Sequence, residues 1–159
     1  MAIPAEQVAQ TKIMAFKDLS ATATCTQVAT YVYNVVKAAN ASGTAMNAML
    51  KAQILATALD VYFSDPALGG NKIGAPAPIG GVAIDLTKVC KNIGGGGTIF
   101  ENVSGAFGGA TNLTVSQMLA YAASQSNPGG TAWYGQIKST QELAKDAFDA
   151  INNQVAFAP

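Results

Sequence analysis

Histidine and arginine are absent from this chain of 159 residues, and charged side chains make up only 11% of it. Nine lysines balance nine carboxylates, so the formal net charge is zero. Nucleic-acid binding is not expected, because the chain has no net positive charge and no arginine for bidentate contacts with phosphate or guanine. The commonest general base and metal ligand is also missing. Catalysis by Ser–His or Cys–His pairs is therefore excluded.

Long apolar runs are absent as well. No window approaches 18 unbroken apolar residues, so no membrane-spanning helix is expected. Residues 1–10 lack a basic start followed by an apolar run, so no signal peptide is expected in this sequence. Half of the residues are nevertheless apolar, the reverse of a disordered composition. The length suits one domain that folds around its own core.

Two neighbouring helices are predicted in the first half of the chain. Residues 25–40 carry an apolar stripe at helical spacing, formed by Val28, Val32, Val35, Val36 and Ala39. A second helix is predicted over residues 44–63, where apolar residues on most sides indicate the central, most buried helix. Pro66 disfavours helix in the residue before it. The short connection at residues 40–43 predicts an antiparallel helical hairpin.

Two more helices are predicted near the C-terminus. Thr114 and Gln117 have the spacing of a capping box at a helix start. The segment from Ser139 to Glu142 has the same pattern and opens the last predicted helix. The fold class is therefore mainly α, a four-helix arrangement of two antiparallel helical hairpins.

Between the hairpins, residues 64–112 form a long excursion rich in glycine and proline. Short β-like pieces at residues 82–86 and 98–100 predict one small β-hairpin within it. Nearly fifty residues without a long element is unusual in a compact domain, so the excursion either covers the helices or carries the function. We predict an N-terminal arm or linker over residues 1–24 and a single helical domain over residues 25–159.

Cys25 and Cys90 are the only cysteines. They are either two buried free thiols or a disulfide. The low charge and the abundance of Ala, Thr, Gly and Asn are typical of exported proteins and favour the disulfide. Closing a loop of about 65 residues would stabilise the fold by roughly 4 kcal/mol.

The remaining candidate sites each have a structural alternative. Trp133 and Tyr134 can stack on a sugar, or they can pack a loop onto the helices. Asp60 and Asp65 are weak candidates for a calcium site. Helix caps and solvated charges are the favoured explanation for them, and the chain has no EF-hand spacing. No cofactor is expected.

Three stretches of the chain resemble a helical module of large exported bacterial cell-surface proteins, often found beside Ig-like domains. They are MLKAQILATALDV at residues 49–61, LTVSQMLAYA at residues 113–122 and QELAKDAFDAINN at residues 141–153, with Phe157 beyond. The resemblance covers residues 25–158 and implies an extracellular or cell-surface setting. It supports the disulfide and brings no catalytic residues. The chain departs from the module at Asp60, where Asn is expected, and in its Gly-rich excursion.

The expected function is a non-catalytic structural or interaction module of an exported bacterial surface protein, with self-assembly left open. Its expected partners are other domains or copies of the same surface protein. The alternative is a module that binds carbohydrate or another small ligand through the excursion, Trp133 and Tyr134. No enzymatic activity is expected.

Overall fold

The computed structural model describes residues 16–20, 22–41, 43, 45–67, 78–94 and 97–153. Over these ranges the chain is mainly helical, as predicted, with four α-helices: α2 (Cys25–Ala39), α3 (Met46–Ser64), α4 (Val115–Ser124) and α5 (Lys138–Asn152). Two small antiparallel sheets accompany them. None of the helices in the described ranges is long and apolar enough to cross a membrane.

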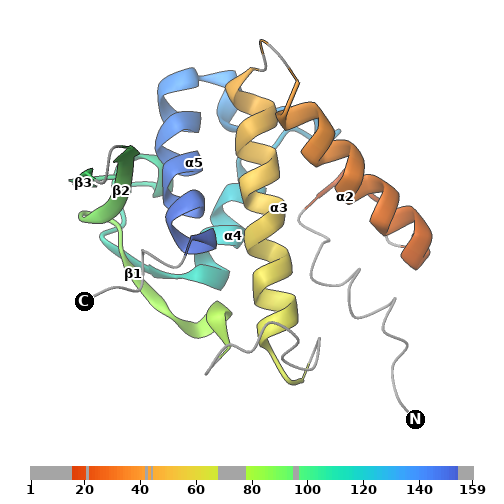
Figure 1. Ribbon diagram of the computed structural model, residues 1–159, viewed down its shortest axis with the longest axis horizontal. Coiled ribbons are helices and arrows are strands. Elements are labelled where there is room, and N and C mark those ends of the chain that lie inside the picture. Colours follow the sequence, from red (N-terminus) through yellow and green to blue (C-terminus); the bar gives the residue numbers. More distant parts are fainter. Residues whose placement is uncertain are drawn as a thin grey trace.

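Helix α3 lies at the centre of the molecule and packs on α2, α4 and α5 (Figure 1). Its buried side chains Leu50, Ile54, Ala58 and Val61 follow the helical repeat along one face. At its end the Ser64 hydroxyl donates to the carbonyl of Val61 and accepts from the N–H of Ile79. The predicted central position of this helix is confirmed.

The helix pairing differs in part from the prediction. The chain reverses direction between α2 and α3 (Figure 1), and α2 packs on α3. The main neighbour of α5 is α3, however, rather than α4. The second predicted hairpin is therefore not confirmed, because α5 buries its apolar face on the central helix.

Of the two capping boxes predicted at helix starts, the structure contains one. Thr114 and Gln117 form the predicted capping box of α4, and Thr24 and Gln27 form one at α2 that the sequence analysis missed. The capping box predicted from Ser139 is wrong. Helix α5 begins at Lys138 and has no side-chain cap, so Ser139 lies inside its first turn.

The Gly-rich excursion contains two sheets rather than one hairpin. A β-hairpin is present, but it is formed by β2 (Val89–Gly94) and β3 (Gly97–Glu101), and the predicted piece at residues 82–86 takes no part in it. β1 (Ala83–Asp85) instead pairs with β4 (Asn112–Thr114), with Ala83 opposite Thr114. This second pairing closes the excursion at its base, immediately before α4. The described residues also form three short 3-10 helices: η1 (Ile79–Gly81), η2 (Ser104–Phe107) and η3 (Tyr134–Gln136).

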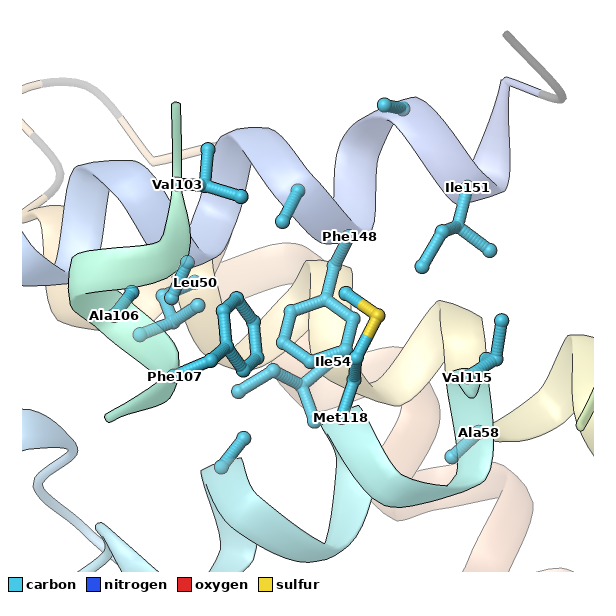
Figure 2. Close-up of a cluster of buried hydrophobic side chains, with 14 of the residues drawn as sticks. Leu50, Ile54, Ala58, Val103, Ala106, Phe107, Val115, Met118, Phe148 and Ile151 are labelled. Atoms are coloured by element: carbon cyan, nitrogen blue, oxygen red, sulfur yellow. The ribbon is translucent and has the colours of Figure 1, made fainter. Parts of the chain in front are cut away.

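The excursion contributes directly to the hydrophobic core. Figure 2 shows Val103 and Phe107, from the segment at η2, beside Phe148 of α5 and Met118 of α4. All four side chains are at most 2% exposed, and the Phe107 and Phe148 rings meet edge to face, with centroids 5.8 Å apart. The end of the excursion therefore covers the helices, one of the two roles predicted for it.

The segment before α2 also reaches the core. Phe16 is completely buried and belongs to the same hydrophobic cluster as the residues of α3 and α5. Residues 1–15, which make up most of the predicted arm or linker, lie outside the described residues. The part from Phe16 onward packs on the helices.

Candidate functional site

Trp133 and Tyr134, the predicted ligand-binding pair, are both buried. Trp133 is 0% exposed and Tyr134 is 6% exposed. The Trp133 ring packs on Phe16, with 5.7 Å between the ring centroids. Because neither face of the indole is open, the prediction that Trp133 stacks on a sugar is wrong. A loop packed onto the helices, the structural alternative, is what the chain forms.

Hydrogen bonds to the side chain of Asn127 hold the loop that carries Trp133 in its conformation. The Oδ1 atom of Asn127 accepts from the backbone N–H groups of Thr131 and Ala132, at 2.8 and 3.1 Å. Ser126 and Trp133 then face each other in an antiparallel bridge. Tyr134 and Gln136 follow with φ angles of 54° and 58°, in the left-handed region that strains residues other than glycine. This left-handed turn leads the chain into α5.

A buried amide network holds this loop against two helices. The Oδ1 atom of Asn47, in α3, accepts from the Trp133 backbone N–H at 2.9 Å and from Gln141 Nε2, in α5, at 3.0 Å. Gln141 Nε2 also donates to the Trp133 carbonyl at 2.9 Å. The sequence pattern placed Gln141 in the predicted cap of the last helix, and no pattern marks Asn47. The network rests on contacts between distant segments, which no local pattern reveals.

Beside this network lies a hollow of about 310 Å³ between the first turns of α3 and α5. Both helix starts lack a side-chain cap, and Lys138 lines the hollow. Met49, which lines the hollow, and Ile137, at the start of α5, are 37% and 58% exposed. Two helix starts without a side-chain cap and a lysine favour an anionic or strongly polar ligand. The hollow is lined by Ala45, Met46, Asn47, Met49, Gln136, Lys138 and Gln141.

A second cavity, of about 300 Å³, lies between α2 and α3. At its polar end Lys51 forms an ion pair with Asp18, and the Tyr31 hydroxyl donates to Asp18 Oδ1 at 2.7 Å. Burial, followed by the hydrogen bond to Asp18, raises the pKa of Tyr31. The polar groups at this end satisfy one another and fasten the segment around Asp18 to the helices. They are therefore arranged for structure rather than for proton transfer.

A charged cluster joins the β2–β3 hairpin to α5. Asp146 accepts from Lys91 Nζ at 2.8 Å and from Lys145 Nζ at 2.7 Å, and its side chain is only 3% exposed. Burial opposes its ionisation, but the hydrogen bonds from Lys145 and Lys91 prevail and lower the pKa of Asp146. The hydrogen bond to Asp146 raises the pKa of Lys91. Two cations on one carboxylate form a stable ionic contact between hairpin and helix.

Glu101 lies at the edge of the same cluster. Its Oε2 atom is 3.9 Å from Lys91 Nζ and is buried, with no hydrogen-bond partner among the described residues. Burial, followed by the neighbouring carboxylate of Asp146, raises the pKa of Glu101. Glu101 and Asp146 are thus two carboxyl groups whose pKa values move in opposite directions, a combination also found in general acid–base pairs. Neither of the two cavities described above includes them.

Asp60 and Asp65, the weak calcium candidates, lie near the end of α3. Burial raises the pKa of Asp60 from 3.8 to about 6, which disfavours the charged form that calcium requires. Asp65 Oδ1 accepts from the N–H of Ala67 at 2.9 Å. The described residues contain no group of three or more acidic, histidine or cysteine side chains that could hold a metal ion. Within that part of the chain, no third acidic side chain lies close enough to Asp60 and Asp65 to complete a calcium site.

The two cysteines lie on different sides of the molecule. Cys25 is exposed at the first position of α2, and Cys90 is half-buried in β2. Helix α2 and strand β2 lie on opposite sides of α3 (Figure 1), and the two sulfurs are not joined in this structure. The disulfide stays a prediction from the sequence and the resemblance. A thiol count of the oxidised protein under denaturing, non-reducing conditions tests it.

The most exposed large apolar side chain among the described residues, that of Phe100, lies on β3. Phe100 is 74% exposed and Ile99 is 48% exposed. Sequence analysis predicted a β-like piece at residues 98–100, but only the tertiary structure places it at the outside of the hairpin. In Figure 1 the β2–β3 hairpin projects from the helices beside α5. Strand β3, which carries both Ile99 and Phe100, is the candidate interaction site.

Comparison with known proteins adds no assignment, since no family model matches the chain and no curated protein or solved structure is significantly similar to it.

Proposed function

We propose that this chain is a non-catalytic structural or interaction module of an exported bacterial surface protein. The exposed pair Ile99 and Phe100 carries this proposal. A Phe side chain with 74% of its surface in water loses the stabilisation that burial would give it. Ile99 is 48% exposed on the other face of the same strand.

The use of the polar side chains also supports a non-catalytic role. Asn47 and Gln141 bind the Trp133 loop, and Asp146 binds two lysines. Asn152 of α5 donates to the carbonyl and the side chain of Gln53 in α3, at 3.0 and 2.7 Å. Apart from the Lys145–Asp146 pair, which lies within α5, each of these contacts joins two segments of the fold. The setting in a surface protein, with its other domains or further copies as partners, rests on the resemblance.

Binding of a small ligand is the second candidate function. The hollow beside Lys138 favours it, because two uncapped helix starts line one concave surface. A carbohydrate or another small polar ligand would bind there through hydrogen bonds, without the indole of Trp133. Titration with acidic sugars, followed by heteronuclear NMR, tests this alternative. Shifts confined to residues 45–49 and 136–141 would favour it over the interaction module.

The proposal itself is tested in the bacterium that carries the gene. The full-length protein is given an epitope tag within its own sequence, and intact cells are labelled with antibody before and after external protease. We expect labelling of intact cells and its loss on protease treatment. Labelling only after the cells are broken would contradict the surface location.

The interaction role is tested in the same cells with Phe100→Lys. We expect this variant to reach the surface but to be lost from cross-linked complexes of the surface protein. Val36→Lys is the matched control, because Val36 is 45% exposed on α2, away from the hairpin. Equal recovery of both variants in the complexes would contradict a role for β3.

A further inference from the structure

Strand β3 has one paired edge and one open edge. Among the described residues the sheet contains only β2 and β3. In an antiparallel ladder alternate residues direct their N–H and C=O groups toward one neighbour and the others direct them away. The outward groups of β3 therefore lack a strand partner in the described part of the chain. An extended polypeptide is the ligand that satisfies such an edge.

The open edge carries few of the features that protect edge strands, and its one charged residue, Glu101, lies at the end of the strand. β3 reads Gly-Thr-Ile-Phe-Glu and contains neither lysine nor proline, the residues that most often block pairing at an edge. The irregularity of the hairpin falls between Asn92 and Gly94, on β2. The bulge therefore distorts the strand nearer α5 and leaves the open edge regular.

The two faces of the hairpin have different surroundings. Lys91 pairs with Ile99 in the hairpin register, and Lys91 contacts Asp146 of α5. Because side chains alternate along a strand, Ile99 and Glu101 share the face that meets α5. Phe100 lies on the opposite face, which explains its high exposure.

We propose that two copies of this chain pair antiparallel through β3, about a two-fold axis at Ile99, to form the four-stranded sheet β2–β3–β3–β2. This inference rests on the proposed function and identifies a second copy as the partner. In this register Ile99 lies opposite Ile99 of the other copy. Phe100 lies opposite residue 98 and diagonally across from the second Phe100, within roughly 7–8 Å, a distance that aromatic side chains can span.

Charge selects this arrangement over the alternatives. Glu101 is the only charged residue of β3. The antiparallel register places it opposite Gly97 of the other copy, whereas a parallel in-register pair would bring two Glu101 side chains together, which is destabilising. The net charge of the whole chain is zero, so two copies approach without overall repulsion. A self-complementary surface of this kind gives a closed two-fold dimer.

The register is tested by disulfide crosslinking of the full chain. In a background of Cys25→Ser and Cys90→Ser, Ile99→Cys should form a covalent dimer under mild oxidation, since directly opposite Cβ atoms lie about 4.5–5.5 Å apart. Ala29→Cys, exposed on α2, is the matched control and should form no covalent dimer. A dimer formed equally by both variants would overturn the pairing. Faster crosslinking by Phe100→Cys than by Ile99→Cys would overturn the register.

The strength of pairing is tested by sedimentation equilibrium over a concentration series. We expect a monomer–dimer equilibrium for the natural sequence, and a dissociation constant raised about tenfold or more by Phe100→Lys. Val36→Lys should leave it unchanged, and circular dichroism should show both variants folded. A natural sequence that stays monomeric throughout the series would overturn the dimer. If Phe100→Lys still abolished surface complexes in that case, the dimer would be wrong and the proposed function would stand.

Discussion

The ring of Phe16 packs against the ring of Trp133, with 5.7 Å between their centroids, and both side chains are completely buried. The contact joins the segment before α2 to the loop before α5. Lys17, the next residue, donates from Nζ to the carbonyl of Ser126 at 2.9 Å, on the same loop. The segment at residues 16–18 therefore completes the core beside the indole, and its contribution can be measured.

Phe16→Ala should destabilise the fold by about 3 to 5 kcal/mol, because it removes a fully buried ring and leaves a cavity. Urea unfolding measures the change. Trp133 is the only tryptophan, so its native fluorescence should also shift to the red as water reaches it. Phe100→Ala is the matched control and should change stability by no more than about 0.5 kcal/mol, since Phe100 is exposed. If Phe16→Ala lowered the free energy of unfolding no more than Phe100→Ala does, Phe16 would not belong to the core.

Gly130 should tolerate substitution less well than Gly43. Both have a left-handed backbone, with φ angles of +69° and +71°, but only at Gly130 would a Cβ meet another segment, 2.7 Å from the Asp18 backbone nitrogen. Gly43→Ala should cost about 1–2 kcal/mol from backbone strain alone. Gly130→Ala should cost at least about 1 kcal/mol more from overpacking. Equal costs in thermal unfolding would mean that the segment at Asp18 does not rest on the loop.

Two alanine substitutions separate the true helix cap from the false one. Thr114→Ala should cost about 1 kcal/mol, because the Thr114 side chain accepts from the N–H of Gln117 at the start of α4. Ser139→Ala should change stability by no more than about 0.5 kcal/mol, since Ser139 lies exposed inside the first turn of α5. Chemical denaturation of both variants decides the point. A comparable loss for Ser139→Ala would restore the capping box that the sequence suggested.

Asp60 should make the fold less stable as the pH rises. Burial raises the pKa of Asp60 from 3.8 to about 6, so between about pH 4 and pH 6 the folded protein holds a proton that the unfolded chain has released. Its contribution is therefore fully present below about pH 4 and is lost as the pH rises through 6. Asp60→Asn should stabilise the protein more at pH 8 than at pH 4. Asn is also the residue that the resemblance leads one to expect at this position.

Asp85 provides a control of opposite sign. Hydrogen bonds from the Thr87 side chain and backbone lower the pKa of Asp85, so ionised Asp85 favours the folded state above its unfolded pKa, and this contribution is lost as the pH falls. Asp85→Asn should therefore lower stability at pH 8 relative to pH 4. Stability curves for both variants over this pH range provide the measurement. The same pH trend in the two variants would contradict the assignment to burial at Asp60.

The features that the sequence predicted correctly depend on residues close together in the chain, and those that it missed depend on contacts between distant segments. The apolar stripe of α2 and the Thr114–Gln117 cap depend on residues within one or two turns, and both were predicted. The pairing of Ala83 with Thr114 joins a strand inside the excursion to the residues immediately before α4, and it was not predicted. The pattern at Ser139 was misleading for the same reason. Helix α5 begins at Lys138, before the predicted cap at Ser139. The contacts with Asn47 and Trp133 hold Gln141 in the core, so it is not part of a cap.

The candidate sites divide in the same way. Composition alone removed histidine-dependent catalysis and arginine-based recognition, because those functions need side chains that the chain lacks. Whether Trp133 faces solvent or the core depended on Phe16, Asn47 and Gln141, which come from three other segments. The prominence of Phe100 likewise follows from the position of β3 at an open edge, a property of the assembled sheet.

The sequence by itself determined a mainly helical fold with little charge and few reactive side chains, since helix periodicity and composition are local properties. Tertiary structure decided which side chains are buried, which carboxyl groups change their pKa and which strand remains open. These outcomes depend on burial and on hydrogen bonds between segments that are distant in the sequence. Their free energies are set only when the core is packed.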